Sequence, residues 1–366
     1  MVSQFTIYSS SDVNGPGPIF GATGSLNKIL EYCLVSGSVS KVAAGWSHPI
    51  ANSASVAGDS TVYACYRPPS GSRMTLFVND NAPNLTSTGK EAWLTGWENM
   101  TSLCNTVYTA NVGAGVGQFP TPEQSLTTGH IVCRKSATSN NTTERYWMIA
   151  ADAYTFYMWI LTGDVITSYT NIGFGDIFSL QGTSDVYRCF IIGRATENTA
   201  VGNAQGQEAT DLLTNNYGGT TQGMVTAHSG QFMARTYGGG GSSIIITRKG
   251  DASASGGYIG TSYYAVYMNG MIQMPNGTDN SIHLSPCSIV EPACLAIRGR
   301  FRGIYHVCHP IGSFSDGQTF AGGGDFAGKT FKIIRNGPNS AGVGLQYGTA
   351  TTGWALEISN TVETNT

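Results

Sequence analysis

The most regular pattern of apolar positions lies near the N-terminal end of the chain. Five apolar residues recur there at spacings of three and four, which places them on one face of a helix. These residues are Leu26, Ile29, Leu30, Cys33 and Leu34. Gly37 follows as a residue type at which helices commonly end, and the Gly-Pro repeat at 15–18 cannot continue regular structure. We therefore predict one amphipathic helix at about residues 23–36.

Most other apolar residues lie in short runs rich in β-branched and aromatic side chains, separated by turn residues. Such runs favour pleated, half-buried strands. The best strand predictions are 74–78, 146–151, 155–161, 187–193, 243–248, 263–268 and 331–335, with a tight hairpin turn at 150–154. Two short helices are also considered, at 120–128 and 206–216. The predicted fold is mainly β with a minor α part, a β-sandwich or barrel-like core with the N-terminal helix packed on it.

Two changes of composition suggest how the chain is divided. Residues 197–207 are polar and rich in Gly and Asn, and residues 238–241 are four consecutive glycines. We predict a β-rich N-terminal region at 1–196, a polar connection at 197–242 and a β-rich C-terminal region at 243–366, or else one continuous domain. No internal repeat of fixed period is present, which argues against a solenoid or propeller.

The charge content then changes the picture of the surface. Only 11% of the residues are charged, against about 25% in typical soluble domains. One interpretation is a neutral β protein rich in Gly and Ser; the other is a surface that neighbouring subunits cover, because interface cores are depleted in charge. The net charge of −3 supplies no basic patch, so we expect no nucleic acid as partner.

The sequence shows no targeting signal, which predicts a product made in a cytoplasm. The start of the chain lacks the basic and apolar regions of a signal peptide, and no run reaches the roughly 18 apolar residues of a spanning helix. We therefore expect no membrane span. The eight cysteines are scattered without a Cys-x-x-Cys pair, which favours buried, reduced thiols.

The densest group of soft metal ligands lies near the C-terminal end. Its members are Cys287, Cys294, His306, Cys308 and His309. Six residues separate the first two cysteines, whereas zinc sites usually space paired ligands by two to four. We therefore expect ordinary buried cysteines and histidines, with neither a metal nor a cofactor.

Four aspartates are the best candidates for acid–base chemistry. These are Asp12, Asp152, Asp176 and Asp185, each beside a turn or an aromatic residue, where aspartate commonly caps the backbone. Their spacing assigns no acid and base roles. The chain also lacks the nucleophile elbow, the zinc-protease helix and the phosphate-binding loop. The sequence therefore predicts no enzyme.

The arginines near position 300 and the tryptophans could each serve either in binding or in holding the fold together. The string Arg298, Arg300 and Arg302 is similar to RNA-binding Arg-Gly segments, but a strand whose arginines pair with carboxylates is the favoured interpretation. We predict that the tryptophans anchor the core or an interface. The anchors are Trp46, Trp97, Trp147 and Trp159, while an alternative sugar-binding platform would add Trp93 and Trp354.

A series of motifs runs in a fixed order through nearly the whole chain. It begins with GATGSLNKILEYCLVSG at 21–37 and AGWS at 44–47. It continues with Tyr66-Arg67, Val78-Asn79-Asp80, Trp97-Glu98-Asn99-Met100, Phe119-Pro120, Lys135-Ser136, Trp147, Ala151-Asp152, Gly173-Phe174-Gly175-Asp176, the stretch 185–189 and the stretch 298–305. In this order the motifs resemble a family of virion structural proteins of tailed bacteriophages. One departure is that the chain runs directly from Gly37 to Gly-Trp, without the small domain that some relatives insert there.

The resemblance implies a structural component of the virion that is made and assembled in the host cytoplasm. We expect its partners to be other virion proteins and copies of itself. The resemblance does not imply a place in the particle; we favour the tail, neck or baseplate, where a contact protein must join symmetric rings. The alternatives are a capsid decoration protein and a module that binds a receptor or a host-surface glycan. The family has no established catalytic residues, so none is carried over to this chain.

Overall fold

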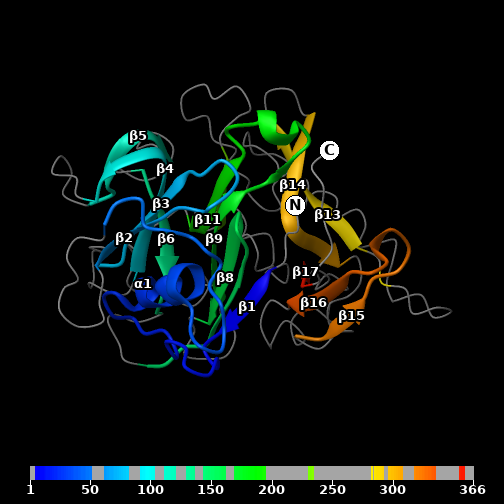
Figure 1. Cartoon of the computed structure of the whole chain (residues 1–366), viewed down its shortest axis with the longest axis horizontal. Helices are drawn as coiled ribbons and strands as arrows, with labels where there is room; N and C mark the ends of the chain where they lie inside the picture. The colour runs from blue at the N-terminus through cyan, green and yellow to red at the C-terminus, as the bar shows by residue number, and fades with distance from the viewer. Residues whose placement is uncertain are drawn as a thin grey trace, which may run out of the picture.

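The computed structural model describes residues 5–51, 62–81, 91–103, 111–120, 129–136, 143–161, 169–194, 230–234, 282, 284–291, 296–307, 317–334 and 354–358. These residues form two antiparallel sheets, a helical segment and two short 3₁₀ turns at Gly182–Ser184 and Gly324–Phe326 (Figure 1). The predicted mainly β fold with one N-terminal helix is confirmed.

The larger sheet has eleven strands. Its main path runs in the order β1 (Thr6–Ser9), β7 (Trp147–Ala151), β8 (Thr155–Leu161), β9 (Tyr169–Asp176), β11 (Cys189–Arg194), β6 (Ile131–Arg134), β4 (Glu91–Ser102), β3 (Thr75–Asn79) and β2 (Tyr63–Tyr66). Off this path, β5 (Ala114–Phe119) pairs with β4, and β12 (Gly230–Ala234) pairs with β11.

The smaller sheet has six strands. It runs in the order β10 (Phe178–Ser179), β14 (Ala296–Val307), β17 (Trp354–Glu357), β16 (Thr330–Ile334) and β15 (Thr319–Ala321), and β13 (Leu284–Glu291) pairs with β14. In Figure 1 this sheet lies on the side of the large sheet away from the helix.

Strand β8 explains why the large sheet is buried on both of its faces. Successive side chains of a strand point to opposite faces. Phe156, Met158 and Ile160 enter the core that contains the helix. Tyr157 and Trp159 enter a second core, which the small sheet completes from its own side. The fold therefore has three layers: helix, large sheet and small sheet.

The large sheet is curled rather than flat. Trp46 Nε1 donates to the carbonyl of Asp152 at the end of β7, while the next residue, Ser47, pairs with Arg67 just after β2. In a flat sheet β7 and β2 would stand seven strand spacings apart, about 34 Å. The Cα atoms of the adjacent residues Trp46 and Ser47 are only about 3.8 Å apart, so the sheet must curl to bring β7 and β2 close to both. The core is therefore barrel-like but open.

The helical segment fills the gap between the two ends of the curled sheet. Tyr32 packs edge-on against Tyr8 of β1, with 5.9 Å between ring centroids. On the other side, Tyr66 of β2 donates its hydroxyl to the carbonyl of Asn27 at 3.2 Å. Both edge strands are therefore fastened to the helix.

The predicted helix at 23–36 is confirmed, with a change of geometry inside it. An α-helix, α1 (Ser25–Leu30), continues directly as a π-helix, η1 (Glu31–Ser36). Gly37 ends the helix with a φ of 65°, as expected from the sequence. A side chain there would stand 2.7 Å from the carbonyl of Lys41, so the turn requires glycine.

Five of the seven predicted strands and the hairpin at 150–154 are confirmed, as β3, β7, β8, β11 and β16. The strands at 243–248 and 263–268, and the helix at 206–216, lie outside the described residues, as does most of 120–128. Strand β9 was missed because Gly173 and Gly175 break its apolar pattern. At Gly173, a side chain would press on the Tyr157 ring at 3.2 Å.

The predicted regions correspond only roughly to the two sheets. Within the segment 197–242 that was predicted to be a connection, the described residues Gly230–Ala234 form strand β12 and pair with β11. Strand β10 belongs to the N-terminal region yet pairs with β14 of the small sheet. The rest of the predicted connection lies outside the described residues, and the domain boundaries stay a prediction.

Gly175 allows a direct test of the close packing in β9. Its φ is +137°, and an added Cβ would lie 2.3 Å from the carbonyl oxygen of Tyr154. We expect Gly175→Ala to lower the free energy of unfolding by about 2–4 kcal/mol, as measured by urea denaturation. Gly182 is the control, because its φ is also positive but no atom lies within 4 Å of the added Cβ. Gly182→Ala should cost about 1 kcal/mol; equal losses would contradict the packing argument.

Candidate functional site

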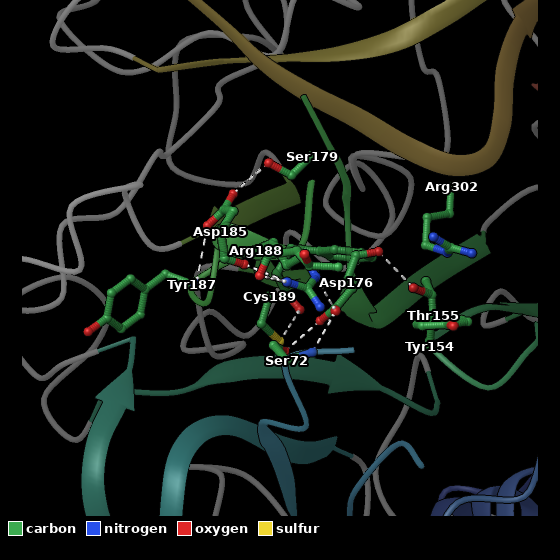
Figure 2. A network of polar contacts seen from close by, with 12 residues as sticks. Ser72, Tyr154, Thr155, Asp176, Ser179, Asp185, Tyr187, Arg188, Cys189 and Arg302 are labelled. Carbon is green, nitrogen blue, oxygen red and sulfur yellow. Dashed lines mark hydrogen bonds and ion pairs between the residues drawn. The ribbon is translucent and has the colours of Figure 1, made fainter. Parts of the chain in front are cut away.

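Several charged residues that the sequence singled out meet where the chain crosses from one sheet to the other (Figure 2). Asp176 ends β9 in the large sheet, and two residues later Phe178 begins β10, which pairs with Arg300 of β14. The polar residues around this crossing form the junction network. Its members are Ser72, Asp152, Asp176, Ser179, Asp185, Tyr187, Arg188, Arg298 and Arg302.

The centre of the junction network is a buried ion pair between Asp185 and Arg298. The guanidinium donates through Nε to Oδ2 at 3.1 Å and through Nη2 to Oδ1 at 2.9 Å. Ser179 Oγ donates to the same carboxylate at 2.8 Å, and the backbone N–H of Tyr187 donates at 3.2 Å. This two-pronged geometry is the strong form of a charge-assisted hydrogen bond.

Asp176 forms the second buried node. It accepts from the backbone N–H of Ser72 at 2.7 Å, from Ser72 Oγ at 2.5 Å and from Arg188 Nε at 2.8 Å. Burial raises the pKa of this carboxyl, and the hydrogen bonds from Ser72 and the charge of Arg188 oppose that rise. Burial also raises the pKa of the neighbouring Cys189 thiol well above its usual range, which favours the protonated thiol over the reactive thiolate.

Arg302 and Asp152 form the third node, nearer the hairpin between β7 and β8. Asp152 Oδ1 accepts the backbone N–H groups of Tyr154 and Thr155, both at 2.7 Å, which is the capping role predicted for it. Its other oxygen lies 3.8 Å from Arg302, whose guanidinium also stands 4.4 Å from the centre of the Tyr154 ring. Arg302 therefore combines a charge pair with a cation–π contact.

Two of the three arginines of β14 pair with carboxylates, as the favoured interpretation predicted. Arg298 and Arg302 are buried in the contacts above. Arg300 is only half-buried and lies over the Phe178 ring at 4.9 Å. Each aspartate of the junction network is held by a cation, and each also accepts backbone N–H groups. The arrangement can lock the two sheets together.

A second buried charge pair holds the start of the helix and was not found from the sequence. Asp80, just after β3, accepts the backbone N–H groups of Leu26 and Asn27 through Oδ2, at 2.8 and 2.9 Å. Its Oδ1 contacts Lys135 Nζ, which also donates to the carbonyl of Ala22 at 2.7 Å. Burial raises the pKa of Asp80, opposed by Lys135 and the helix amides. The only signal was that Asp80 and Lys135 both lie in motifs of the resemblance.

The tryptophans are buried anchors, as predicted. The side chains of Trp46, Trp93, Trp97, Trp147 and Trp159 are at most 4% exposed. Three of their indole N–H groups donate to backbone carbonyls, at Asp152, Val112 and Gly17. An exposed sugar-binding platform built from these five side chains is therefore wrong, because none offers a free ring face. The side chain of Trp354 lies outside the described residues.

The structure describes none of the side chains of the five candidate metal ligands, since only the backbone of Cys287 and His306 is described, so the expectation of no metal stays a prediction. Cys294, Cys308 and His309 lie outside the described residues, while His306 pairs through its backbone with Ser285 and Trp354. Among the described residues, no three His, Cys, Asp or Glu side chains could share a metal ion. The cysteines at 33, 65, 133 and 189 are buried, and none of them forms a disulfide.

Comparison with known proteins leaves the family resemblance as a prediction. No model of a known protein family matches the chain, and no curated protein sequence matches it significantly. Over the residues that the structure describes, none of the helices has the length and apolar character needed to cross a membrane.

Proposed function

We propose that this chain is a non-enzymatic structural subunit of a tailed-bacteriophage virion, placed in the tail, neck or baseplate. It acts through contacts with copies of itself and with other virion proteins. The proposal begins from the ordered sequence motifs, and the structure adds the observation that supports it best: the motif residues contact one another.

Three contacts join motifs that are far apart in the sequence. Asp80 contacts Lys135, Trp46 donates to the carbonyl of Asp152, and Asp185 pairs with Arg298. Residues shared by a catalytic family are expected to converge on a cleft. Here they fasten the helix, the hairpin and the two sheets. Motif residues that fasten a scaffold fit a protein whose work is repeated contact.

The surface supports the same role. Ser40 Oγ donates to the carbonyl of Val13, so two loops lie side by side. They carry three exposed apolar residues, with Val13 at 72%, Val39 at 104% and Val42 at 83% exposure. A second exposed apolar group lies beside the Asp185–Arg298 pair and consists of Leu180, Val186 and Ile297. Exposed apolar groups on a sparsely charged surface suit subunit contacts.

A particle reconstruction tests this function. Virions of the phage that encodes the chain would be purified, analysed by mass spectrometry and imaged by cryo-electron microscopy. We expect the chain in washed particles, in rings at the tail, neck or baseplate. Hundreds of copies on the head lattice would instead identify a capsid decoration protein. Absence from washed particles, or clearing of host peptidoglycan by the purified chain, would overturn the structural role.

A further inference from the structure

Both ring nitrogens of His48 face oxygen atoms that accept hydrogen bonds. Nδ1 lies 2.7 Å from the backbone carbonyl of Cys65, and Nε2 lies 2.6 Å from Oε2 of Glu31. A carbonyl cannot donate, so Nδ1 must carry a proton. A neutral imidazole has only one N–H, and its Nε2 would then present a lone pair to the carboxylate. The geometry is satisfied by an imidazolium that donates to both oxygens.

His48 joins the helix to one end of the large sheet. Glu31 is the first residue of the π-helix η1, and Cys65 belongs to the edge strand β2. The neighbouring Ser47 pairs with Arg67 on the side of this strand away from β3. The backbone N–H and C=O of every second residue point to the same side of a strand, so the carbonyl of Cys65 also points away from β3. Among the described residues no strand follows β2 in the sheet, so His48 caps a carbonyl on this edge of the sheet.

The opposite edge of the sheet has a cap without an imidazole. On β1, Lys41 Nζ donates to the carbonyl of Ile7 at 2.8 Å, and Asp12 accepts the backbone N–H of Ser9 at 3.0 Å. Lys41 and Asp12 also form an ion pair at 2.6 Å. Unpaired edge groups invite pairing with another chain, and charged side chains that cover them prevent it. The two caps are therefore comparable in role and differ in chemistry.

We propose that His48 is a proton-operated latch: charged, it fastens the π-helix to the edge strand β2, and neutral, it must release either Glu31 or the carbonyl of Cys65. Release uncovers a backbone acceptor at this edge of the large sheet. The latch depends on no virion role, because it follows from two hydrogen bonds within the chain.

The groups around the ring determine the direction of the switch. On the helix, Glu31 contacts the ring, and Lys28 lies one turn earlier in the chain. On the edge strand, the Tyr66 ring lies 5.2 Å from the His48 ring, centroid to centroid, with Cys65 before it and Arg67 after it. Burial lowers the pKa of His48, but the hydrogen bonds to Glu31 and to the Cys65 carbonyl raise it by more, so the net pKa is raised. The latch therefore stabilises the fold fully below the unfolded value of about 6.5 and loses this contribution as pH rises through the folded pKa.

The test is a pH titration of the full chain labelled with ¹⁵N-histidine and followed by NMR. The His48 signal is identified by its loss in His48→Gln. We expect both nitrogens to be protonated at pH 6.5 and the midpoint to lie above about 6.5. The difference in unfolding free energy between wild type and His48→Gln should shrink as pH rises through that midpoint, with faster hydrogen exchange in residues 31–36 and 47–51.

Two further variants keep the test decisive. Glu31→Gln removes the carboxylate, and the His48 midpoint should fall even where His48→Gln folds poorly. Lys41→Met alters the other edge cap, and the pH-dependent difference assigned to His48 should stay unchanged. A single protonated nitrogen on His48 at pH 6.5, or a difference between wild type and His48→Gln that is constant across pH, would overturn the latch.

Discussion

Replacing Asp80 by alanine is expected to lower the free energy of unfolding by about 3–5 kcal/mol. Asp80 and Lys135 are both fully buried, so the substitution leaves the lysine charge in the core without its counter-ion. It also removes the acceptor of two helix N–H groups, at Leu26 and Asn27. The helix has no substitute for this cap, because Gly24 stands at its N-cap and no side-chain cap bond is present there.

A double-mutant cycle separates the ion pair from the helix cap. Lys135→Met removes the other partner and should cost a similar amount. The double variant, Asp80→Ala with Lys135→Met, buries no unpaired charge and should cost less than the sum of the two single losses by at least about 2 kcal/mol. Urea denaturation followed by circular dichroism measures the free energy of unfolding of the two single variants and of the double variant.

The Lys41–Asp12 pair supplies the matched control for this cycle. It joins the same kinds of charge but is partly exposed, with side-chain exposures of 28% and 10%. Asp12→Ala also removes the acceptor of the Ser9 N–H and should therefore cost about 1–2 kcal/mol. Equal losses at Asp80 and Asp12, or strict additivity in the Asp80–Lys135 cycle, would show that burial of the pair does not govern its contribution.

What the sequence could predict was local. Helical spacing located the segment from Leu26 to Leu34, and the aromatic and β-branched residues of 155–161 predicted a strand. In the structure, the two faces of that strand are buried in different cores. Strand β9 escaped prediction because its glycines are required by neighbouring backbone rather than by its own pattern. The π-helical geometry of η1 likewise has no signature in the apolar spacing.

The candidate site depended on contacts that sequence spacing cannot encode. Asp80 and Lys135 are 55 residues apart, and Asp185 and Arg298 are 113 apart. Their residue types were informative, since the arginine string predicted inward pairing with carboxylates and the aspartates predicted backbone capping. The choice of partners follows from the curl of the large sheet and from the crossing at β10, and both are tertiary properties.

The Asp185–Arg298 pair leads to the second large effect. Arg298→Met should lower the free energy of unfolding by about 3–5 kcal/mol, because it leaves the fully buried Asp185 carboxylate without its cation. Arg298→Lys should recover only part of that loss. Lysine restores the charge but not the fork that serves both carboxylate oxygens and the carbonyl of Tyr187.

The position of the Asp185–Arg298 pair predicts which part of the fold becomes less stable when the pair is lost. Asp185 follows β10 and Arg298 lies in β14, so loss of the pair should raise hydrogen exchange at the junction of the two sheets more than in the helix α1. Arg300→Lys is the control on the same strand, because Arg300 is half-buried over the Phe178 ring and should cost about 1 kcal/mol or less. If Arg298→Lys were as stable as wild type, the bidentate ion pair would not hold the two sheets together. The same conclusion would follow if hydrogen exchange in Arg298→Met rose equally at the junction and in helix α1.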